Sequence, residues 1–201
     1  MAIGAEGGSV PSETAQRAIT AVALAAPAAA ALVLGPPYLT VFVGAVAAVE
    51  DWEWVRVTGA QVFGVTGATL AGLLIAAVAV AAFVRFAWAY AVLAAALAIV
   101  YAVARAHARE HALAIAGGAL YIGVPALSLL WLYERPEVGR ALVIWLVSVV
   151  IATDVCAFFV GRAVGGPKLW PRVCPGKTWA GLGGGVAGAA ATGVALGLAL
   201  E

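Results

Sequence analysis

Mostly apolar runs alternate with short polar segments along nearly the whole chain. The seven runs cover residues 17–34, 37–55, 66–84, 86–104, 112–132, 139–160 and 179–200. Each run is close to the roughly 20 residues that a helix needs to cross the hydrocarbon core of a bilayer. The pattern therefore predicts an all-α polytopic membrane protein with about seven transmembrane helices.

The polar segments set the boundaries of this membrane domain. Residues 1–16 are small and polar, and we expect a disordered or surface-lying N-terminal segment there. A single helical membrane domain is expected over 17–201. The link between the third and fourth runs is only a few residues around Arg85. It is either a tight hairpin or a break within one helix.

Composition excludes the main alternatives to a membrane protein. Hydrophobic residues make up 65% of the 201 residues, charged residues make up 10%, and the mean hydropathy is +1.06. An average soluble domain carries about 25% charged residues, so a soluble fold would lack polar side chains to cover its surface. A net charge of +1 gives no indication of nucleic-acid binding. Cys156 and Cys174 lie too far apart for a CxxC pair, which argues against a disulfide framework or a zinc site.

The distribution of basic residues predicts the orientation. If the seven runs alternate across the membrane, the side that holds the N-terminus carries eight basic residues, and the other side carries Arg85, Arg135 and Arg140. The eight are Arg17, Arg56, Arg105, Arg109, Arg162, Lys168, Arg172 and Lys177. Because cytoplasmic loops are rich in Lys and Arg, we expect a multi-pass protein of a bacterial inner (plasma) membrane with its N-terminus in the cytoplasm.

The loop after the sixth run is the longest polar stretch between the runs. It holds four of the eleven basic residues, Arg162, Lys168, Arg172 and Lys177. Its glycines allow a backbone to approach a ligand closely, and the loop ends where the next helix begins with Thr178 as a candidate cap. The loop is therefore a candidate cradle for phosphate groups. The alternative is that its cations anchor the loop to anionic lipid and set the orientation.

Asp154 lies inside the sixth apolar run, about six residues from its predicted end and so roughly 9 Å below it. A carboxylate at that depth is costly and needs a partner. One hypothesis is that Asp154 forms a structural ion pair with a nearby Arg or Lys. The other hypothesis is that Asp154 is a ligand for a hard cation such as Mg²⁺, which takes oxygen donors and often bridges to substrate phosphates.

Other polar residues have simpler explanations. His107 and His111 are spaced i, i+4, but without a third ligand they indicate a polar helix end rather than a metal site. Glu50, Asp51 and Glu53 indicate a solvated end of the second run, with a metal role as a minor alternative.

Glycines in the last run form two small-xxx-small pairs, Gly181 with Gly185 and Gly184 with Gly188. Such pairs let transmembrane helices pack closely. If the chain forms a homodimer, we expect its contact on this glycine face, at positions such as Gly188.

Residues 154–185 resemble the phosphatidate cytidylyltransferase (CDP-diacylglycerol synthase) family in order and spacing. The matching positions are Asp154, Ala157, Phe158, Gly161, Arg162, Gly165, Lys168, Leu169, Pro171, Pro175, Lys177, Thr178, Gly181, Gly184 and Gly185. Glu53-Trp54 and the segment 120–125 resemble family positions more weakly. The chain departs from the pattern at Val155, at Cys174, where the family has Ser, and at Ala180, where it has Glu.

The resemblance implies a reaction. The phosphate of phosphatidic acid attacks the α-phosphorus of CTP, CDP-diacylglycerol forms and pyrophosphate leaves, with Mg²⁺ required. It implies catalytic roles for Asp154 and Lys177, with Asp154 also a metal ligand. It implies phosphate binding by Arg162, Lys168 and Lys177. Arg172 and Thr178, which lie in the same basic loop and at the start of the next helix, are further candidates for substrate binding.

The family's later acidic signature, a Lys-Asp pair followed by His-Gly-Gly and Asp-Arg, does not occur among these residues. We therefore expect one of three cases: the sequence is a truncated synthase, the protein is a degenerate relative of the family, or another chain supplies the missing part of the site. The alternative function is a non-catalytic membrane protein of the same fold that binds lipid or a partner. A transporter is disfavoured, because the polar residues cluster at one membrane face rather than along a path.

Overall fold

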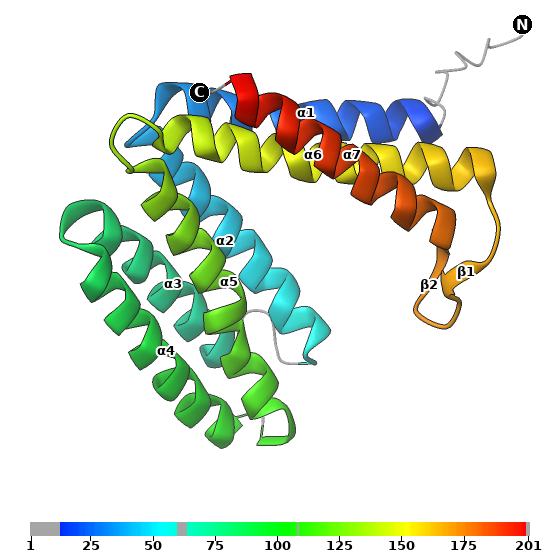
Figure 1. The fold of residues 1–201 in the computed structure, drawn as a ribbon. Helices are drawn as coiled ribbons and strands as arrows, with labels where there is room; N and C mark the ends of the chain where they lie inside the picture. The colour runs from blue at the N-terminus through cyan, green and yellow to red at the C-terminus, as the bar shows by residue number, and fades with distance from the viewer. Residues whose placement is uncertain (1–12, 60–63, 108, 200–201) are drawn as a thin grey trace, which may run out of the picture. The chain divides into compact units, whose positions relative to one another are not determined.

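The computed structural model describes residues 13–59, 64–107 and 109–199. Within these ranges the chain forms seven α-helices, a short 3₁₀ helix and one two-stranded hairpin (Figure 1). The helices are α1 Glu13–Leu34, α2 Tyr38–Val57, α3 Val65–Phe83, α4 Phe86–His107, α5 Ala112–Tyr133, α6 Gly139–Val164 and α7 Trp179–Ala199. The 3₁₀ helix η1 is Arg109–His111, and the strands are β1 Lys168–Trp170 and β2 Cys174–Thr178. The prediction of an all-α membrane architecture is confirmed.

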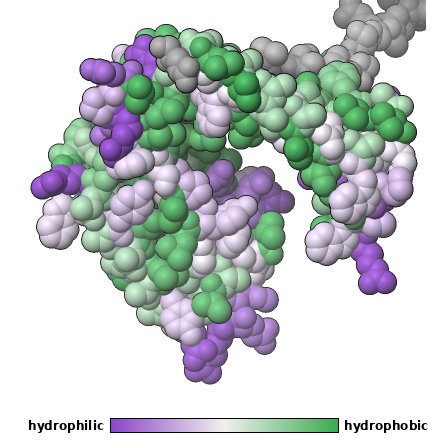
Figure 2. All heavy atoms as spheres, in the orientation of Figure 1, coloured by the Kyte–Doolittle hydropathy of each residue, from purple (hydrophilic) through white to green (hydrophobic). Residues whose placement is uncertain are grey.

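Among the described residues, five helical segments have the length and apolar composition to cross a bilayer: α3, α4, Arg109–Tyr133, α6 and α7. In α1 the apolar part is the shorter stretch Ala25–Leu34. Helix α2 carries Glu50, Asp51, Glu53 and Arg56 in its second half. Figure 2 shows mostly apolar side chains over the visible helix surfaces, with hydrophilic side chains gathered at the loops.

Every predicted run became a helix, and the boundaries differ by a few residues. The N-terminal polar segment was expected to reach residue 16, but α1 already begins at Glu13; residues 1–12 lie outside the described part of the chain. Helices α4 and α6 run three and four residues past their predicted ends, because Arg105 and Arg162 are good helix formers and continue the hydrogen-bond ladder beyond the apolar run. The link at Arg85 is a tight hairpin, since α3 ends at Phe83, Val84 is its C-cap and α4 begins at Phe86.

The chain divides into two compact units, Met1–Leu127 and Ser128–Glu201. Helices α1 to α4, η1 and most of α5 belong to the first unit. The end of α5, α6, the β1–β2 hairpin and α7 belong to the second. The prediction of a single membrane domain over 17–201 stays a prediction.

The first unit packs its helices around an aliphatic core. Its largest fully buried side chains are Val55, Leu70, Leu74, Leu93, Val100, Ile115, Ile122 and Leu127. Glycines on α5 permit the close approach. A Cβ added at Gly118 would lie 2.6 Å from Cδ1 of Trp54, and one added at Gly123 would overlap Leu93. Because these positions carry no side chain, α5 lies directly against its neighbours.

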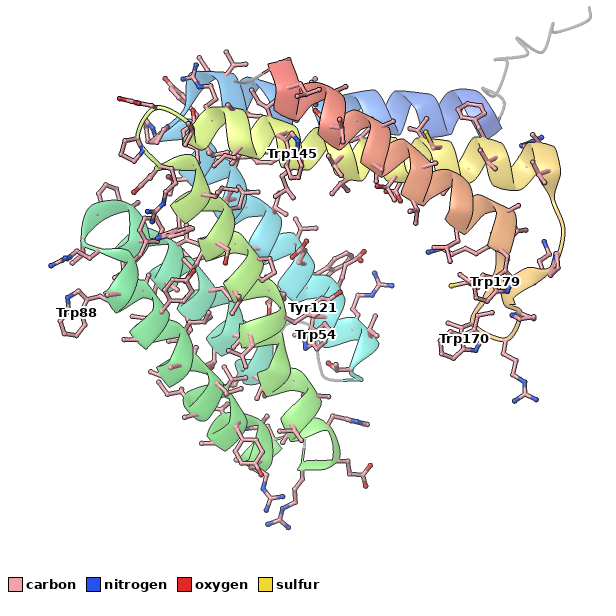
Figure 3. The ribbon with its side chains drawn as sticks, in the orientation of Figure 1. Trp54, Trp88, Tyr121, Trp145, Trp170 and Trp179 are labelled. Atoms are coloured by element: carbon pink, nitrogen blue, oxygen red, sulfur yellow. The ribbon has the colours of Figure 1, made fainter. Side chains whose placement is uncertain are left out.

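Trp54 and Tyr121 join α2 to α5. Their rings stack at 4.8 Å between centroids, and the Trp54 indole N–H donates to the carbonyl of Ala114 at 3.0 Å (Figure 3). The two segments that resembled family positions only weakly, Glu53-Trp54 and 120–125, thus contact each other. The contact is a packing contact with a satisfied indole N–H.

The prediction of a solvated acidic helix end is right for Glu50 and Glu53 and wrong for Asp51. Asp51 is 5% exposed, and its Oδ1 has no hydrogen-bond partner among the described residues. The reason is helical periodicity. Asp51 lies four residues from both Ala47 and Val55, which belong to the buried face of α2.

His107 and His111 do not share a helix face. Helix α4 ends at His107, whose Nδ1 lies 3.0 Å from the carbonyl oxygen of Val103, and His111 closes the separate 3₁₀ turn. The interpretation as a polar helix end fits this geometry.

Candidate functional site

The second unit is an α6–α7 helix pair joined by a small β hairpin. The sequence predicted a loop here, and the structure forms two antiparallel strands in which Lys168 lies opposite Thr178, and Trp170 opposite Cys174. The register is irregular between Lys168 and Trp170. The Trp179 N–H donates to the carbonyl of Pro167 at 3.1 Å, which ties the start of α7 to the start of the hairpin.

The glycine pair after α6 makes the chain reversal possible. Gly165 and Gly166 have φ angles of 65° and 93°, a region that side-chain-bearing residues rarely adopt. The Gly165 N–H bonds back to the carbonyl of Gly161 at 3.1 Å, so Gly165 ends the helix. The turn directs the chain from α6 into β1.

Thr178 caps α7. The Gly181 N–H donates to Thr178 Oγ1 at 3.0 Å, which is the N-cap to N3 bond, and Thr178 is 6% exposed. The predicted cap is confirmed. Since the hydroxyl oxygen already accepts this bond and the side chain is buried, the predicted role of Thr178 in substrate binding stays a prediction.

Glycines of α7 pack against α6 along most of its length. A Cβ added at Gly181 would lie 2.8 Å from the carbonyl oxygen of Ala157. One at Gly184 would lie 2.5 Å from Cβ of Val160, and one at Gly188 would lie 2.5 Å from Sγ of Cys156. The small-xxx-small face is thus covered by α6 of the same chain. The homodimer stays a prediction, and its expected contact on this face is not supported, because α6 already occupies the face.

Farther along the pair, a tryptophan fixes the relation of the two helices. Trp145 of α6 donates its indole N–H to the carbonyl of Gly193 in α7 at 2.8 Å, and a Cβ at Gly193 would lie 3.4 Å from its ring (Figure 3). Contacts at both ends and the middle of the pair hold α6 and α7 together, and this pair carries the hairpin.

Four cations surround the hairpin, and all four side chains are exposed: Arg162, Lys168, Arg172 and Lys177. Lys177 immediately precedes Thr178, the cross-strand partner of Lys168, so the structure brings the two lysines onto adjacent strands. Arg172 lies in the turn between the strands, and Arg162 lies two residues before the end of α6. No Asp or Glu occurs between Val155 and Leu200. The surface is therefore suited to bind polyanions.

Asp154 lies within α6, seven residues and so about 10 Å along the axis before Gly161. It adjoins Thr153, whose carbonyl oxygen faces Gly185, so along the axis of α6 it lies at the level of the body of α7 rather than at the level of the hairpin. Its side chain is exposed, and no ion pair with an arginine or lysine involves it within the described ranges. The hypothesis that Asp154 forms a structural ion pair with an Arg or Lys is therefore not supported within the described residues.

Metal-ligating side chains do not gather in the described part of the chain, where no group of three or more His, Cys, Asp and Glu occurs. A carboxylate suits Mg²⁺, and Mg²⁺ commonly uses one or two protein carboxylates together with substrate phosphates and water. Asp154 fits as one such ligand, without forming a complete site by itself.

Comparison with known proteins gives a consistent result. The cytidylyltransferase family profile matches residues 15–201. A phosphatidate cytidylyltransferase of Brucella suis is 48% identical over 79 residues, which are 39% of this chain and 29% of that protein. One of Pseudomonas aeruginosa is 35% identical over 183 residues, 86% of this chain and 66% of that protein. The chain thus matches two thirds or less of these relatives' length, and no solved structure matches it.

Proposed function

The chain belongs to the cytidylyltransferase family, and on that premise we propose that it serves nucleotidyl transfer from CTP to phosphatidic acid. A phosphate oxygen of phosphatidic acid attacks the α-phosphorus of CTP. The bond to the β-phosphate breaks, CDP-diacylglycerol forms and pyrophosphate leaves. Curated relatives that bear the name phosphatidate cytidylyltransferase support this assignment.

The β1–β2 hairpin is the observation that carries the proposal. It presents Lys168 and Lys177 on adjacent strands at the start of α7, with Arg162 and Arg172 close by in sequence and with no acid in the segment. Nucleotidyl transfer needs charge neutralisation and in-line positioning more than covalent chemistry by the protein. The four cations bind the triphosphate and the lipid phosphate, and Lys177 stabilises the charge that develops as pyrophosphate departs.

The proposed role of Asp154 is to hold a Mg²⁺ ion. Bound there, the ion would neutralise phosphate charge during transfer. Asp154 contributes a single carboxylate that is free of ion pairs in the described chain and lies in the same helix as Arg162. The remaining ligands would be substrate phosphates and water.

The proposed reaction also fits a membrane orientation. CTP is water-soluble and phosphatidic acid lies in the bilayer, so the cations have to stand at a membrane surface. We place the hairpin on the cytoplasmic side, with the N-terminus on the same side, because the basic residues concentrate there.

Transfer of labelled CMP from CTP to phosphatidic acid tests the proposal directly. The purified chain in nanodiscs with Mg²⁺ is compared with the same chain carrying Lys177→Gln, and CTP binding is titrated in parallel. We expect Mg²⁺-dependent CTP binding that Lys177→Gln weakens. Absence of any CTP binding by a folded chain would favour a non-catalytic membrane protein of this family.

A further inference from the structure

The hairpin exposes large apolar side chains beside its cations. Trp170 is 63% exposed, Val173 is 65% exposed and Trp179 is 57% exposed. Figure 3 shows Trp170 on β1 and Trp179 at the start of α7, both projecting from the hairpin region. Their exposure is not needed for phosphate binding, since indole rings and a valine offer a phosphate no strong donor beyond one N–H.

The two ends of α6 differ in charge. The turn between α5 and α6 mixes signs, with Glu134, Arg135 and Glu137 in a short segment. The hairpin end carries Lys168, Arg172 and Lys177 without an acid. An anionic surface attracts the hairpin end and has no net attraction for the turn.

Helix length places these ends on opposite sides of a membrane. The 26 residues of α6 span about 39 Å, more than the roughly 30 Å of the hydrocarbon core. The hairpin therefore emerges at the level of the head groups. Tryptophan prefers this layer, because its ring is largely apolar and its N–H remains in contact with polar groups.

We propose that the β1–β2 hairpin lies in the head-group layer of an anionic leaflet, with Trp170, Val173 and Trp179 inserted among the lipids. Lys168, Arg172 and Lys177 then stand at the level of the lipid phosphates. Because Lys168, Arg172 and Lys177 lie beside these exposed apolar side chains, we expect an anionic phospholipid surface to cover them. The proposal goes beyond nucleotidyl transfer and holds whether or not the chain transfers CMP.

The depth of the hairpin can be measured with a nitroxide at Val173→Cys, in a chain where Cys156 and Cys174 are replaced by Ser. The probes are nanodiscs of phosphatidylcholine with and without phosphatidylglycerol. Collisions with oxygen report membrane burial, and collisions with a water-soluble nickel complex report aqueous exposure. A label at Val138→Cys, in the mixed-charge turn and 52% exposed, is the matched control.

With phosphatidylglycerol present, we expect the Val173 label to gain oxygen collisions and lose nickel collisions, and the Val138 label to change little. Trp170→Ser with Trp179→Ser should return the Val173 label toward water. Trp88→Ser, which alters an equally exposed tryptophan in the first unit, should not.

A Val173 label that stays aqueous in both membranes overturns the proposal. A label shielded from both collision partners also overturns it, because protein rather than lipid would then cover the hairpin. Neither readout requires catalysis. A failure of the nucleotidyl-transfer proposal would appear in CTP binding and leave the label depth unchanged.

Discussion

The two compact units bury their apolar surface to very different extents. In the most apolar stretch of each spanning segment, 39% of residues are buried in α3, 22% in α4 and 44% in Arg109–Tyr133, against 6% in both α6 and α7. The first unit is a packed bundle with its own core. The second is a helix pair whose outer faces need lipid or further protein to cover them. The four cations at the hairpin and Asp154 lie on the less buried second unit.

The largest effect is expected when a hairpin cation of the second unit is removed and CTP affinity is measured. Lys177→Gln should raise the dissociation constant for CTP by about tenfold to a hundredfold, because a charge-assisted hydrogen bond contributes roughly 1.5–3 kcal/mol. Thermal stability should not change, since Lys177 is exposed. Calorimetric titration in nanodiscs measures the affinity.

Arg105→Gln, an exposed cation on α4, is the control for charge alone. If both variants weaken CTP binding equally, the hairpin has no special role and the contrast between the units fails.

The second prediction concerns the packed core of the first unit. Gly118→Val should destabilise the chain by about 1–3 kcal/mol, because the new side chain meets the Trp54 ring and Leu70. Gly117→Val is a close control, since a Cβ there meets nothing within 4 Å. Unfolding in detergent measures both, and equal stability of the two variants would contradict the close packing of α5.

A comparable pair of glycines tests the α6–α7 contact. Gly184→Ala should cost about 1–2 kcal/mol, because its Cβ would lie 2.5 Å from Cβ of Val160, and Gly183→Ala should be tolerated. We expect Gly184→Ala also to weaken CTP binding, since α6 and α7 together carry the hairpin. If CTP binding is unaffected while stability falls, the helix pair does not position the cations.

The smallest effect is expected at Asp51. Asp51→Ala should stabilise the chain by about 1 kcal/mol, because it removes a buried carboxyl oxygen that has no partner in the described chain. The same unfolding assay measures it, with Glu50→Ala on the exposed face as control. A loss of stability would contradict the claim that the buried carboxyl oxygen destabilises the chain.

Local signals were enough for much of the candidate site. The cations and the cap at Thr178 were predicted from the sequence, since capping depends on a few consecutive residues. The helix end at Gly165 was not predicted, because the apolar run already stops at residue 160. The antiparallel strands were missed, because β1 and β2 are only three and five residues long and β2 carries Pro and Gly. The glycines of α7 were recognised as a packing face, but their partner was α6 rather than a second copy.

The positions of all seven helices were determined by the sequence alone. A bilayer demands long apolar runs with every backbone group bonded inside the helix, so run length and composition suffice. Only the tertiary structure decided which face of each helix is buried. Asp51 is buried, whereas Glu50 and Glu53 on the same helix are exposed. The ring of Trp54 stacks on that of Tyr121, which lies 67 residues later in the chain. These outcomes depend on how each helix is rotated against its neighbours. Because nearly all faces of these helices are apolar, the hydrophobic pattern does not reveal how each helix is rotated. The rotation is set by the packing of glycines against large side chains on neighbouring helices.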